Sequence, residues 1–288
     1  MSVLKVAVIE PVGGHGGMDY YDFGLCGGLS KSGLDVLLFT CDETEIPANL
    51  QFKVNRIYRR IYGKNSSIIR AFRYLWGSSL ALLSCCYDGR KIVHFHWFHV
   101  GPLELFNILF SKLLFRSVVV TAHDVEAFAE GLSVPLFVRI AYHLSDAVIA
   151  HNYVSQSELA EKVGVHKDKI NVIPHGNYLQ TMSSLSDKSE ARSRLRLSVQ
   201  AKVLLFFGQI KDVKGLDLLL EAMPNILKAY PDTLLLIAGK VWKTDFSKYD
   251  ALIKNYGIKD NCRTDIRYIS GSDVADYYAS ADMVILPY

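Results

Sequence analysis

Along this chain of 288 residues, short apolar runs alternate with longer stretches in which apolar residues recur every three or four positions. The short runs predict buried strands, and the longer stretches predict amphipathic helices. This alternation is typical of parallel sheets with helices on both faces. The predicted strands are Leu4–Ile9, Asp35–Phe39, Ile92–His96, Val118–Thr121, Ala147–Ala150, Asn171–Ile173, Val203–Phe207, Thr233–Ala238, Asp265–Ile269 and Met283–Leu286.

A polar, serine-rich passage at Ser183–Ser189 interrupts the alternation after the sixth predicted strand. Such a passage is typical of an interdomain connection or a surface loop. We therefore predict an α/β protein with two Rossmann-like, doubly wound parallel sheets, over residues 1–178 and 179–288. Open sheets of this kind bind ligands at the carboxyl ends of their strands, which predicts a ligand crevice between the domains.

Composition narrows the class of protein. Half of the residues are hydrophobic and the net charge is only +3, which indicates a globular chain and gives no sign of a nucleic-acid partner. The five cysteines are odd in number and form no CxxC pair, as expected for reduced thiols in the cytosol. The N-terminus lacks a signal-peptide pattern, and no membrane-spanning helix is predicted. A cytoplasmic protein follows.

The segment Val203–Met223 predicts a phosphate site. An apolar strand stops at Gly208, and the pair Lys214-Gly215 opens a helix. This layout directs a cation and unpaired backbone amides at one point, which suits a diphosphate. The ligand could be a nucleotide cofactor or a nucleotide-activated substrate.

A glycine-rich loop follows the first predicted strand and contains Gly13, Gly14, Gly16 and Gly17. Glycines allow the backbone to approach an anion or a sugar closely. The alternative is a tight strand-to-helix turn that binds no ligand. The dinucleotide fingerprint GxGxxG is incomplete because Asp19 stands where its third glycine is needed. An NAD-dependent enzyme is therefore weakly supported.

Five motifs together resemble the retaining GT-B glycosyltransferases of family 4, over essentially the whole chain. They are the loop Gly13–Gly17, TAHD at Thr121–Asp124, VIPHGN at Val172–Asn177, FFGQIKDVKG at Phe206–Gly215 and the closing ADMVILPY. The resemblance implies transfer of a sugar from a nucleotide diphosphate sugar to an acceptor. It also implies front-face displacement in a cleft between two Rossmann-like domains, with neither a metal nor another cofactor.

The resemblance assigns roles to individual residues. His123 matches a catalytic histidine near the donor sugar, although it could instead be a strand-end histidine bonded to backbone. Asp124 beside it is expected to cap the following helix. Lys214 matches the lysine that holds the donor diphosphate, where negative charge develops on the leaving group. Gln209 stands where the family usually has an arginine, so donor binding could depend on Lys211.

Further candidates are expected to contact either the donor or the acceptor. The donor set also includes Gly13, Gly14, Gly16, Gly17, Ile269 and Ser270, and the acceptor or cleft set comprises His96, His175 and Asn177. The series His94, His96 and His99 resembles a metal cluster, because residues two apart on a strand share a face. No carboxylate or cysteine lies nearby in the sequence and no DxD pair is present, so we predict no metal site.

Between Ile46 and Tyr87 no residue is acidic, and basic residues alternate with aromatic ones. The basic residues of this membrane patch are Arg56, Arg59, Arg60, Lys64, Arg70 and Arg73. Such a mixture suits an anionic membrane surface, and the alternative is a solvated basic face. We predict a peripheral enzyme at the cytoplasmic leaflet that glycosylates a lipid-linked or polysaccharide acceptor and binds no nucleic acid.

The resemblance also concerns the end of the sequence. Family members normally continue past Leu286–Tyr288 to a pair of carboxylates that hold the donor, so the second domain is predicted to be incomplete. We favour a fragment over a natural chain without activity, because a terminal strand would leave an open sheet edge. Three classes stay open: a glycosyltransferase, an inactive nucleotide-sugar-binding or partner subunit, and an oxidoreductase or epimerase on the same fold.

Overall fold

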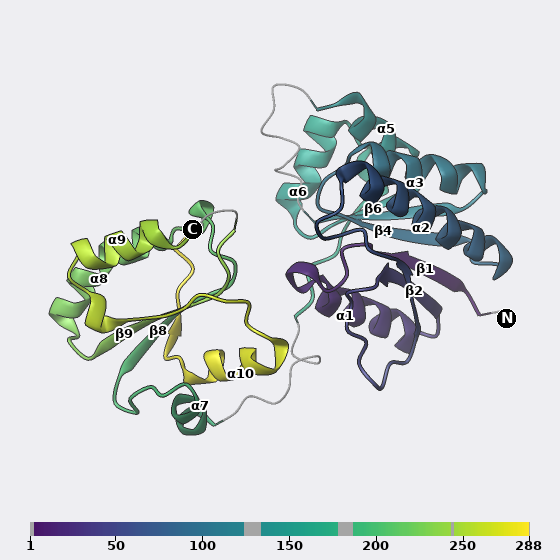
Figure 1. Cartoon of the computed structure of the whole chain (residues 1–288). Coiled ribbons are helices and arrows are strands. Elements are labelled where there is room, and N and C mark those ends of the chain that lie inside the picture. Colours follow the sequence, from purple (N-terminus) through teal and green to yellow (C-terminus); the bar gives the residue numbers. More distant parts are fainter. Residues whose placement is uncertain (1–2, 124–133, 178–186, 243–244, 288) are drawn as a thin grey trace. The chain divides into compact units, whose positions relative to one another are not determined.

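The computed structural model describes residues 3–123, 134–177, 187–242 and 245–287. The chain divides into two compact units, Met1–Thr181 (unit 1) and Met182–Tyr288 (unit 2) (Figure 1). The predicted boundary between residues 178 and 179 lies outside the described residues.

Unit 1 is built on a parallel sheet of seven strands in the order β3-β2-β1-β4-β5-β6-β7. The strands are β1 (Lys5–Ile9), β2 (Asp35–Cys41), β3 (Lys53–Tyr58), β4 (Ile92–Trp97), β5 (Ser117–Ala122), β6 (Ala147–Ala150) and β7 (Ile170–Val172). The helices are α1 (Met18–Lys31), α2 (Ser67–Tyr87), α3 (Pro102–Leu113), α5 (Leu136–Leu144) and α6 (Tyr153–Glu158), with the shorter turns η1 (His15–Gly17), η2 (Leu159–Val163) and η3 (Lys167–Lys169).

Helices cover both faces of this sheet. On β1, Val6 and Val8 pack in one cluster with Phe23 of α1. The alternate residues of the strand, Ala7 and Ile9, pack in another cluster that includes side chains of α2, α3 and α5. Successive side chains of a strand point to opposite faces, so a continuous apolar strand indicates a sheet buried on both sides. Unit 1 therefore has the doubly wound architecture predicted.

Unit 2 repeats the design with four parallel strands in the order β10-β9-β8-β11. Its strands are β8 (Lys202–Phe207), β9 (Thr233–Ala238), β10 (Cys262–Asp265) and β11 (Met283–Val284). Its helices are α7 (Lys188–Arg194), α8 (Leu216–Ala229), α9 (Ser247–Asn255) and α10 (Gly271–Ser280), with the turns η4 (Asp212–Lys214) and η5 (Lys259–Asn261). Phe206 of β8 packs with α8 and α9, whereas Leu205 packs with Tyr277 of α10.

Two strands differ most from the sequence-based prediction, and β11 (Met283–Val284) is two residues shorter than predicted. β3 was missed: it is an edge strand with several exposed residues, so its sequence lacks a continuous apolar run. β10 covers Cys262–Asp265 and not Asp265–Ile269, because its pairing with β9 ends where Asp265 meets Ala238. Ile266 and Ile269 still pack against the cores of unit 2, which explains why that stretch resembles a strand.

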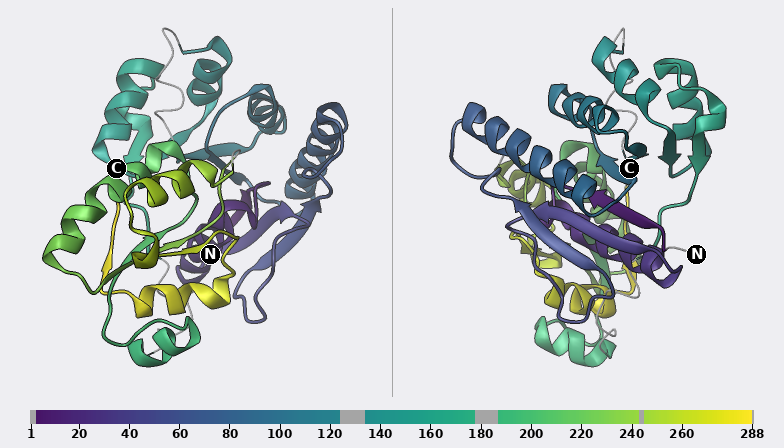
Figure 2. Two further views of the ribbon diagram at one scale, coloured as in Figure 1. Left: turned by 60° about the vertical axis from the view of Figure 1, so that its left-hand side comes forward. Right: turned by 90° about the vertical axis from the view of Figure 1, so that its right-hand side faces the viewer.

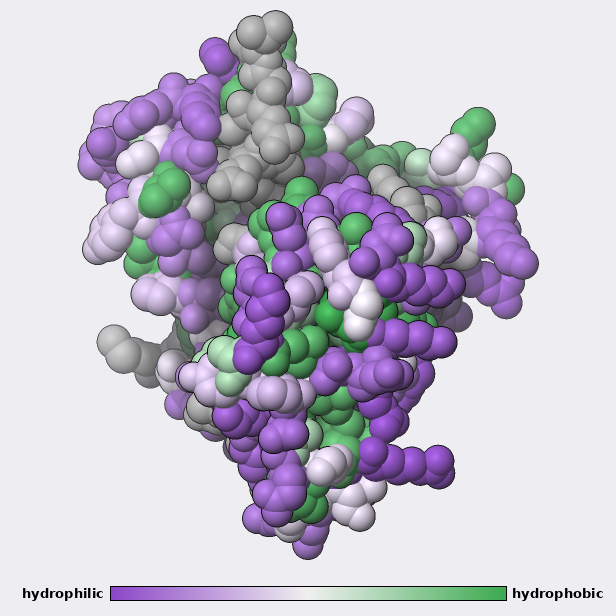
Figure 3. All heavy atoms as spheres, turned by 90° about the vertical axis from the view of Figure 1, so that its left-hand side faces the viewer, coloured by the Kyte–Doolittle hydropathy of each residue, from purple (hydrophilic) through white to green (hydrophobic). Residues whose placement is uncertain are grey.

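On the face shown in Figure 3, hydrophilic residues predominate and hydrophobic residues lie in small groups between them. No helix in the described part of the chain combines the length and the apolar composition that a membrane crossing needs.

Candidate functional site

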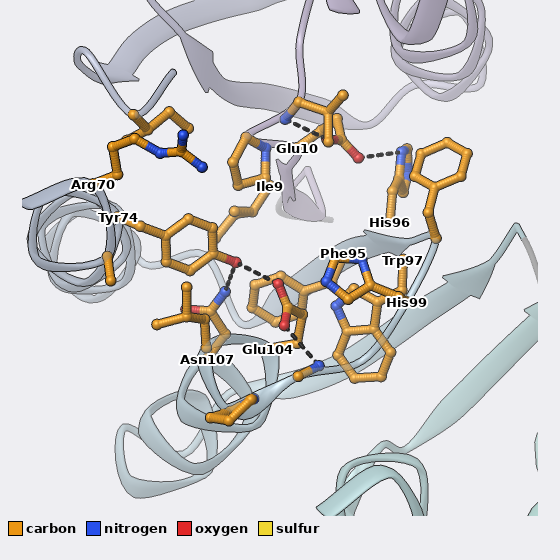
Figure 4. Close-up of a pocket in the computed structure, with 18 of the residues that line it drawn as sticks. Ile9, Glu10, Arg70, Tyr74, Phe95, His96, Trp97, His99, Glu104 and Asn107 are labelled. Atoms are coloured by element: carbon orange, nitrogen blue, oxygen red, sulfur yellow. Dashed lines mark hydrogen bonds and ion pairs between the residues drawn. The ribbon is translucent and has the colours of Figure 1, made fainter. Parts of the chain in front are cut away.

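The first candidate site is a pocket in unit 1 beyond the carboxyl ends of β1 and β4 (Figure 4). Its volume is about 470 Å³. The segment Glu10–Val12 after β1 and the end of β4 form one side, and Tyr74 of α2 and Asn107 of α3 form another. The carboxyl end of a parallel sheet is the usual ligand position in doubly wound folds. This pocket thus has the place expected for a substrate.

A hydrogen-bonded network fixes the wall between α2 and α3 (Figure 4). Tyr74 Oη donates to Glu104 Oε1 at 3.5 Å and accepts from Asn107 Nδ2 at 2.9 Å. Glu104 Oε2 in turn accepts from the backbone N–H of Gly101 at 2.8 Å. Arg70 lies on the same pocket wall, so this member of the predicted membrane patch contributes a cation to the pocket. The pocket lining therefore contains aromatic rings, the guanidinium of Arg70 and several hydrogen-bonding groups.

A buried cluster of Glu10, Asp22 and His96 lies at the base of this site. The three side chains are fully buried, and His96 Nδ1 lies 3.0 Å from Asp22 Oδ1 and 3.8 Å from Glu10 Oε2. Burial raises the pKa of both carboxyls, and the Asp22 carboxyl raises that of Glu10 further. Burial also lowers the pKa of His96 to about 3. The carboxyls therefore hold their protons to higher pH, and the imidazole is neutral.

These carboxylates were not predicted from the sequence. Neither lies near His96 along the chain, but β1 and α1 bring Glu10 and Asp22 to the His96 ring. A signal existed, because Glu10 ends an apolar strand and Asp22 shares a helix face with the buried Met18 and Cys26. Only the packing of α1 against the sheet shows that they meet.

Replacing Glu10 with glutamine is expected to stabilise the protein by several degrees at pH 8 and to change it least at pH 5. The pKa of Glu10 is raised by burial, so the folded protein keeps a proton that the unfolded chain releases above about pH 4. The contribution of the Glu10 carboxyl to the free energy of unfolding is fully present below that pH. It falls by up to roughly 1 kcal/mol per pH unit as the pH rises towards the raised pKa. Glutamine does not ionise, and its oxygen can still accept from the Val12 N–H, 2.6 Å away in the wild type. Thermal unfolding between pH 5 and pH 8 measures the difference.

The matched control is Glu161→Gln, which removes an exposed carboxyl and should leave the pH profile unchanged. The low pKa of His96 has the opposite effect on stability, because it destabilises the folded protein below about pH 6. This effect is common to the wild type and both variants, so it does not change the comparison. Identical pH profiles for Glu10→Gln and the wild type would mean that the Glu10 carboxyl is ionised in the folded state.

A second cluster in unit 1 contains three histidines from three strand ends. His123 follows β5, His151 follows β6 and His175 lies in the loop after β7. His123 Nδ1 lies 3.4 Å from His151 Nε2, and the ring of Tyr21 on α1 packs against all three imidazoles. The order β5-β6-β7 in the sheet explains the cluster, because adjacent parallel strands end at the same edge.

His123, the predicted catalytic residue, is half-buried within this cluster. Phe98 stacks on its ring with the centroids 4.8 Å apart. Burial, together with His96 and His151, lowers the pKa of His123 to about 2. The ring therefore acts as a neutral hydrogen-bonding group. Its Nε2 is buried without a hydrogen-bond partner among the described residues, so it is not a histidine satisfied by backbone.

The glycine-rich loop packs tightly against the end of β2. Gly13 has a φ of +58°, and a Cβ at this position would lie 2.1 Å from Thr44 Oγ1. A Cβ on Gly14 would lie 3.1 Å from the Glu43 carbonyl oxygen, and Gly17 has a φ of +81°. Gly13 is thus required by backbone conformation and packing, whatever ligand the loop binds. Of the neighbouring candidates, Asp124 lies outside the described residues.

In unit 2 the predicted donor residues lie at the end of β8. Gln209 is exposed there, and the turn η4 carries Lys214 to the start of α8. Gly215 has a φ of +64°, and a Cβ on it would lie 2.6 Å from the Pro287 carbonyl oxygen. Lys211 Nζ lies 4.8 Å from the Trp242 ring centroid, over its face. The local arrangement keeps the predicted combination of a cation and a helix N-terminus.

Two donor candidates have other contacts. The side chain of Ile269 is buried in the core of unit 2, so only its backbone could reach a ligand. Ser270 precedes α10 as its N-cap residue, and the Oγ atoms of Ser270 and Ser272 are 2.8 Å apart. In unit 1, His175 and Asn177 are both exposed in the loop after β7.

Residues 15–179, more than half of the 288 residues, match the sequence model described as Glycosyltransferase Family 4. The chain belongs to glycosyltransferase family 4. Residues 187–288 match the model described as Glycosyl transferases group 1. The two matches fall in unit 1 and unit 2 respectively.

Curated relatives match part of this family 4 chain. D-inositol 3-phosphate glycosyltransferase from Segniliparus rotundus is 32% identical over 145 residues, which are 50% of this chain and 32% of that protein. Mannosylfructose-phosphate synthase from Agrobacterium fabrum is 27% identical over 153 residues, 51% of this chain and 34% of that protein. The aligned segments thus span about a third of the length of these relatives.

Solved structures share the fold over nearly the whole chain. Sucrose-phosphate synthase from Thermosynechococcus elongatus has a TM-score of 0.73 at 17% identity, covering 99% of this chain and 75% of that one. Anabaena HepE in complex with UDP-glucose has a TM-score of 0.70 at 16% identity, covering 98% of this chain and 73% of that one. These neighbours confirm the predicted GT-B fold with its two Rossmann-like units.

Proposed function

We propose that this family 4 chain carries out sugar transfer from a nucleotide diphosphate sugar, with retention at the anomeric carbon and without a metal or other cofactor. The observation that carries the proposal is the end of β8, where Lys214 precedes the first turn of α8 in an arrangement that would suit a diphosphate. The solved HepE structures contain UDP and UDP-glucose, which supports a uridine nucleotide as the first donor to test. The transferred sugar is proposed to be a hexose.

The described residues divide the proposed reaction between the two units. In unit 2, Lys214 and the amides at the start of α8 would stabilise the negative charge that develops on the departing diphosphate. In unit 1, the neutral His123 ring would exchange a hydrogen bond with the donor sugar. Front-face displacement needs no nucleophilic side chain, because the departing phosphate takes the proton of the acceptor hydroxyl.

We propose the pocket of about 470 Å³ as the acceptor site. Aromatic walls suit the apolar faces of a sugar ring, and Arg70 suits a negatively charged group such as a phosphate. The names of two relatives include a phosphorylated sugar or cyclitol, which fits that requirement. A lipid-linked or polysaccharide acceptor with an anionic group would also supply a negative charge for Arg70.

Isothermal titration with UDP, GDP and UDP-glucose tests the donor part of the proposal. We expect UDP and UDP-glucose to bind and GDP to bind more weakly. Released UDP, measured with and without a membrane extract as the acceptor source, then reports transfer. Failure of both nucleotides and UDP-glucose to bind would contradict the proposed donor, and binding without turnover would favour the inactive-subunit alternative.

We also propose that the protein associates with the inner face of the membrane through α2. Figure 2 shows this helix, drawn in blue, in two further views of the chain. The exposed apolar residues Ile68, Phe72, Trp76 and Leu80 recur at every fourth position along it. The basic residues Arg56, Arg59, Arg60 and Arg73 line a hollow with Phe72, Trp76 and Leu80. An apolar stripe beside basic residues is typical of a helix that lies in an anionic interface.

The double variant Phe72→Ser, Trp76→Ser is expected to bind anionic vesicles at least about tenfold more weakly than the wild type, because each apolar side chain contributes about 1.5 kcal/mol or more when buried. Co-sedimentation at low salt measures the binding, with neutral vesicles as the comparison. Leu218→Ser removes an exposed apolar residue of α8 and serves as the control. Equal binding of all three proteins, or none by the wild type, would contradict the membrane role of α2.

A further inference from the structure

We propose that His123, His151 and His175 form a binding site for a late first-row transition-metal cation such as Zn²⁺. Each histidine offers one ring nitrogen, and the three nitrogens lie within 4.8 Å of one another. Imidazole is a preferred ligand of zinc, and sites with three histidines leave a fourth position for water or a substrate.

The spacing of two of the nitrogens already matches a metal site. Zinc–nitrogen bonds of about 2.0–2.1 Å in tetrahedral geometry place two ligand nitrogens about 3.3–3.4 Å apart. His123 Nδ1 and His151 Nε2 are 3.4 Å apart. A ring nitrogen of His175 completes the set from an exposed loop, so a movement of about 1–2 Å would bring it to the same spacing. The cation would bind between strand ends that the sheet holds in place.

In His151 and His175, the second ring nitrogen makes the kind of contact that orients a metal ligand. His151 Nδ1 lies 3.0 Å from the carbonyl oxygen of Ile173, and His175 Nδ1 lies 2.7 Å from the carbonyl oxygen of Gly176. A ligating histidine usually donates its second ring N–H to a carbonyl or a carboxylate, which fixes the tautomer and the ring orientation. With Nδ1 in these contacts, Nε2 is the nitrogen of each of these two rings that would bind the cation.

Aromatic side chains hold one ring of the cluster in place. Tyr21 and Phe98 cover the His123 ring, which keeps the imidazole in one orientation.

The second group of potential ligands in unit 1, formed by Glu10, Asp22 and His96, provides a competing location. All three of its side chains are fully buried, so a cation would need an opening of the core to enter. The histidine cluster has an exposed member, His175, and is the accessible site of the two.

Titration of the untagged protein with Zn²⁺, and with Co²⁺ as a spectroscopic probe, tests the proposal. We expect one equivalent of Zn²⁺ to bind, and Co²⁺ to give the intense visible absorption bands of a four-coordinate site. His175→Asn should weaken Zn²⁺ binding at least about 100-fold, since losing even an outer contact of a ligand costs about 10- to 100-fold. Because His175 is exposed, this variant is expected to fold, and circular dichroism checks it.

The control His166→Gln removes an exposed histidine outside the cluster and should bind Zn²⁺ as the wild type does. Asp22→Asn should also keep the site, because it changes only the carboxylate cluster. Zn²⁺ binding that survives His175→Asn but is lost in Asp22→Asn would overturn the proposal, as would no binding by the wild type. Zn²⁺ at His123 should compete with the donor sugar, a consequence that rests on the proposed function. The result of the Zn²⁺ titration does not depend on the proposed function.

Discussion

Lys214→Ala is expected to weaken UDP binding about 10- to 100-fold and to lower the rate of sugar transfer about 100- to 1,000-fold. Lys214 ends the turn η4, and Gly215 separates it from the start of α8. The lysine charge and the positive end of the helix dipole would both favour an anion such as the diphosphate. The larger effect on transfer arises because the diphosphate gains negative charge as its bond to the sugar breaks.

Isothermal titration with UDP and an assay of released UDP measure the two effects. Lys228→Ala is the matched control, since it removes an exposed lysine from the last turn of the same helix. Lys211→Ala tests the alternative that the neighbouring lysine replaces the arginine that the family usually has at Gln209. If Lys214→Ala bound UDP as tightly as Lys228→Ala, the diphosphate would not be held at the start of α8.

Gly239→Ala is expected to destabilise unit 2 by about 3 kcal/mol or more, and the variant is expected to fail to fold if unit 2 is only marginally stable. Gly239 follows β9 with a φ of +147°, and a Cβ there would lie 1.8 Å from the carbonyl oxygen of Gly208. The clash is with backbone and not with a side chain that could rotate away. The two strand ends would have to separate, which breaks the bond from Gly208 N–H to the Ala238 carbonyl.

Gly257→Ala separates the two causes of this effect. Gly257 also has a positive φ, +66°, but nothing lies within 4 Å of the position of its Cβ. Its substitution should cost only the strain of the left-handed backbone, about 1–2 kcal/mol. Urea unfolding of both variants gives the comparison. Equal destabilisation would show that β8 and β9 can separate at their ends without loss of stability.

Gly239 lies close to the loop Gly208–Lys214 after β8, which we propose as the donor loop. The carbonyl of Gly208 that its Cβ would meet belongs to the residue before Gln209, at the start of the donor loop. A milder variant that folds should therefore also bind UDP more weakly than the wild type. The close approach of two glycine backbones sets the path of the donor loop as well as the stability of the sheet.

Much of the fold could be predicted because it depends on local patterns. Apolar runs such as Val203–Phe207 must be buried wherever they fall, and their alternation with amphipathic helices specifies a parallel sheet. The edge strand β3 could not be found in this way, because its exposed residues lack the pattern and its pairing with β2 defines it. The end of β10 likewise depends on its register with β9.

The candidate sites also differ in whether they depend on neighbouring residues in the chain or on tertiary contacts. The sequence by itself predicted a phosphate site at Lys214 and Gly215, because a strand end, a cation and a helix start lie within a few residues of each other. It also indicated the family and placed His123 at a strand end. Only the tertiary structure brought Glu10 and Asp22 to His96, and His151 and His175 to His123. Such clusters join residues far apart in the chain, and their meeting depends on which strands are neighbours in the sheet and which helix covers them.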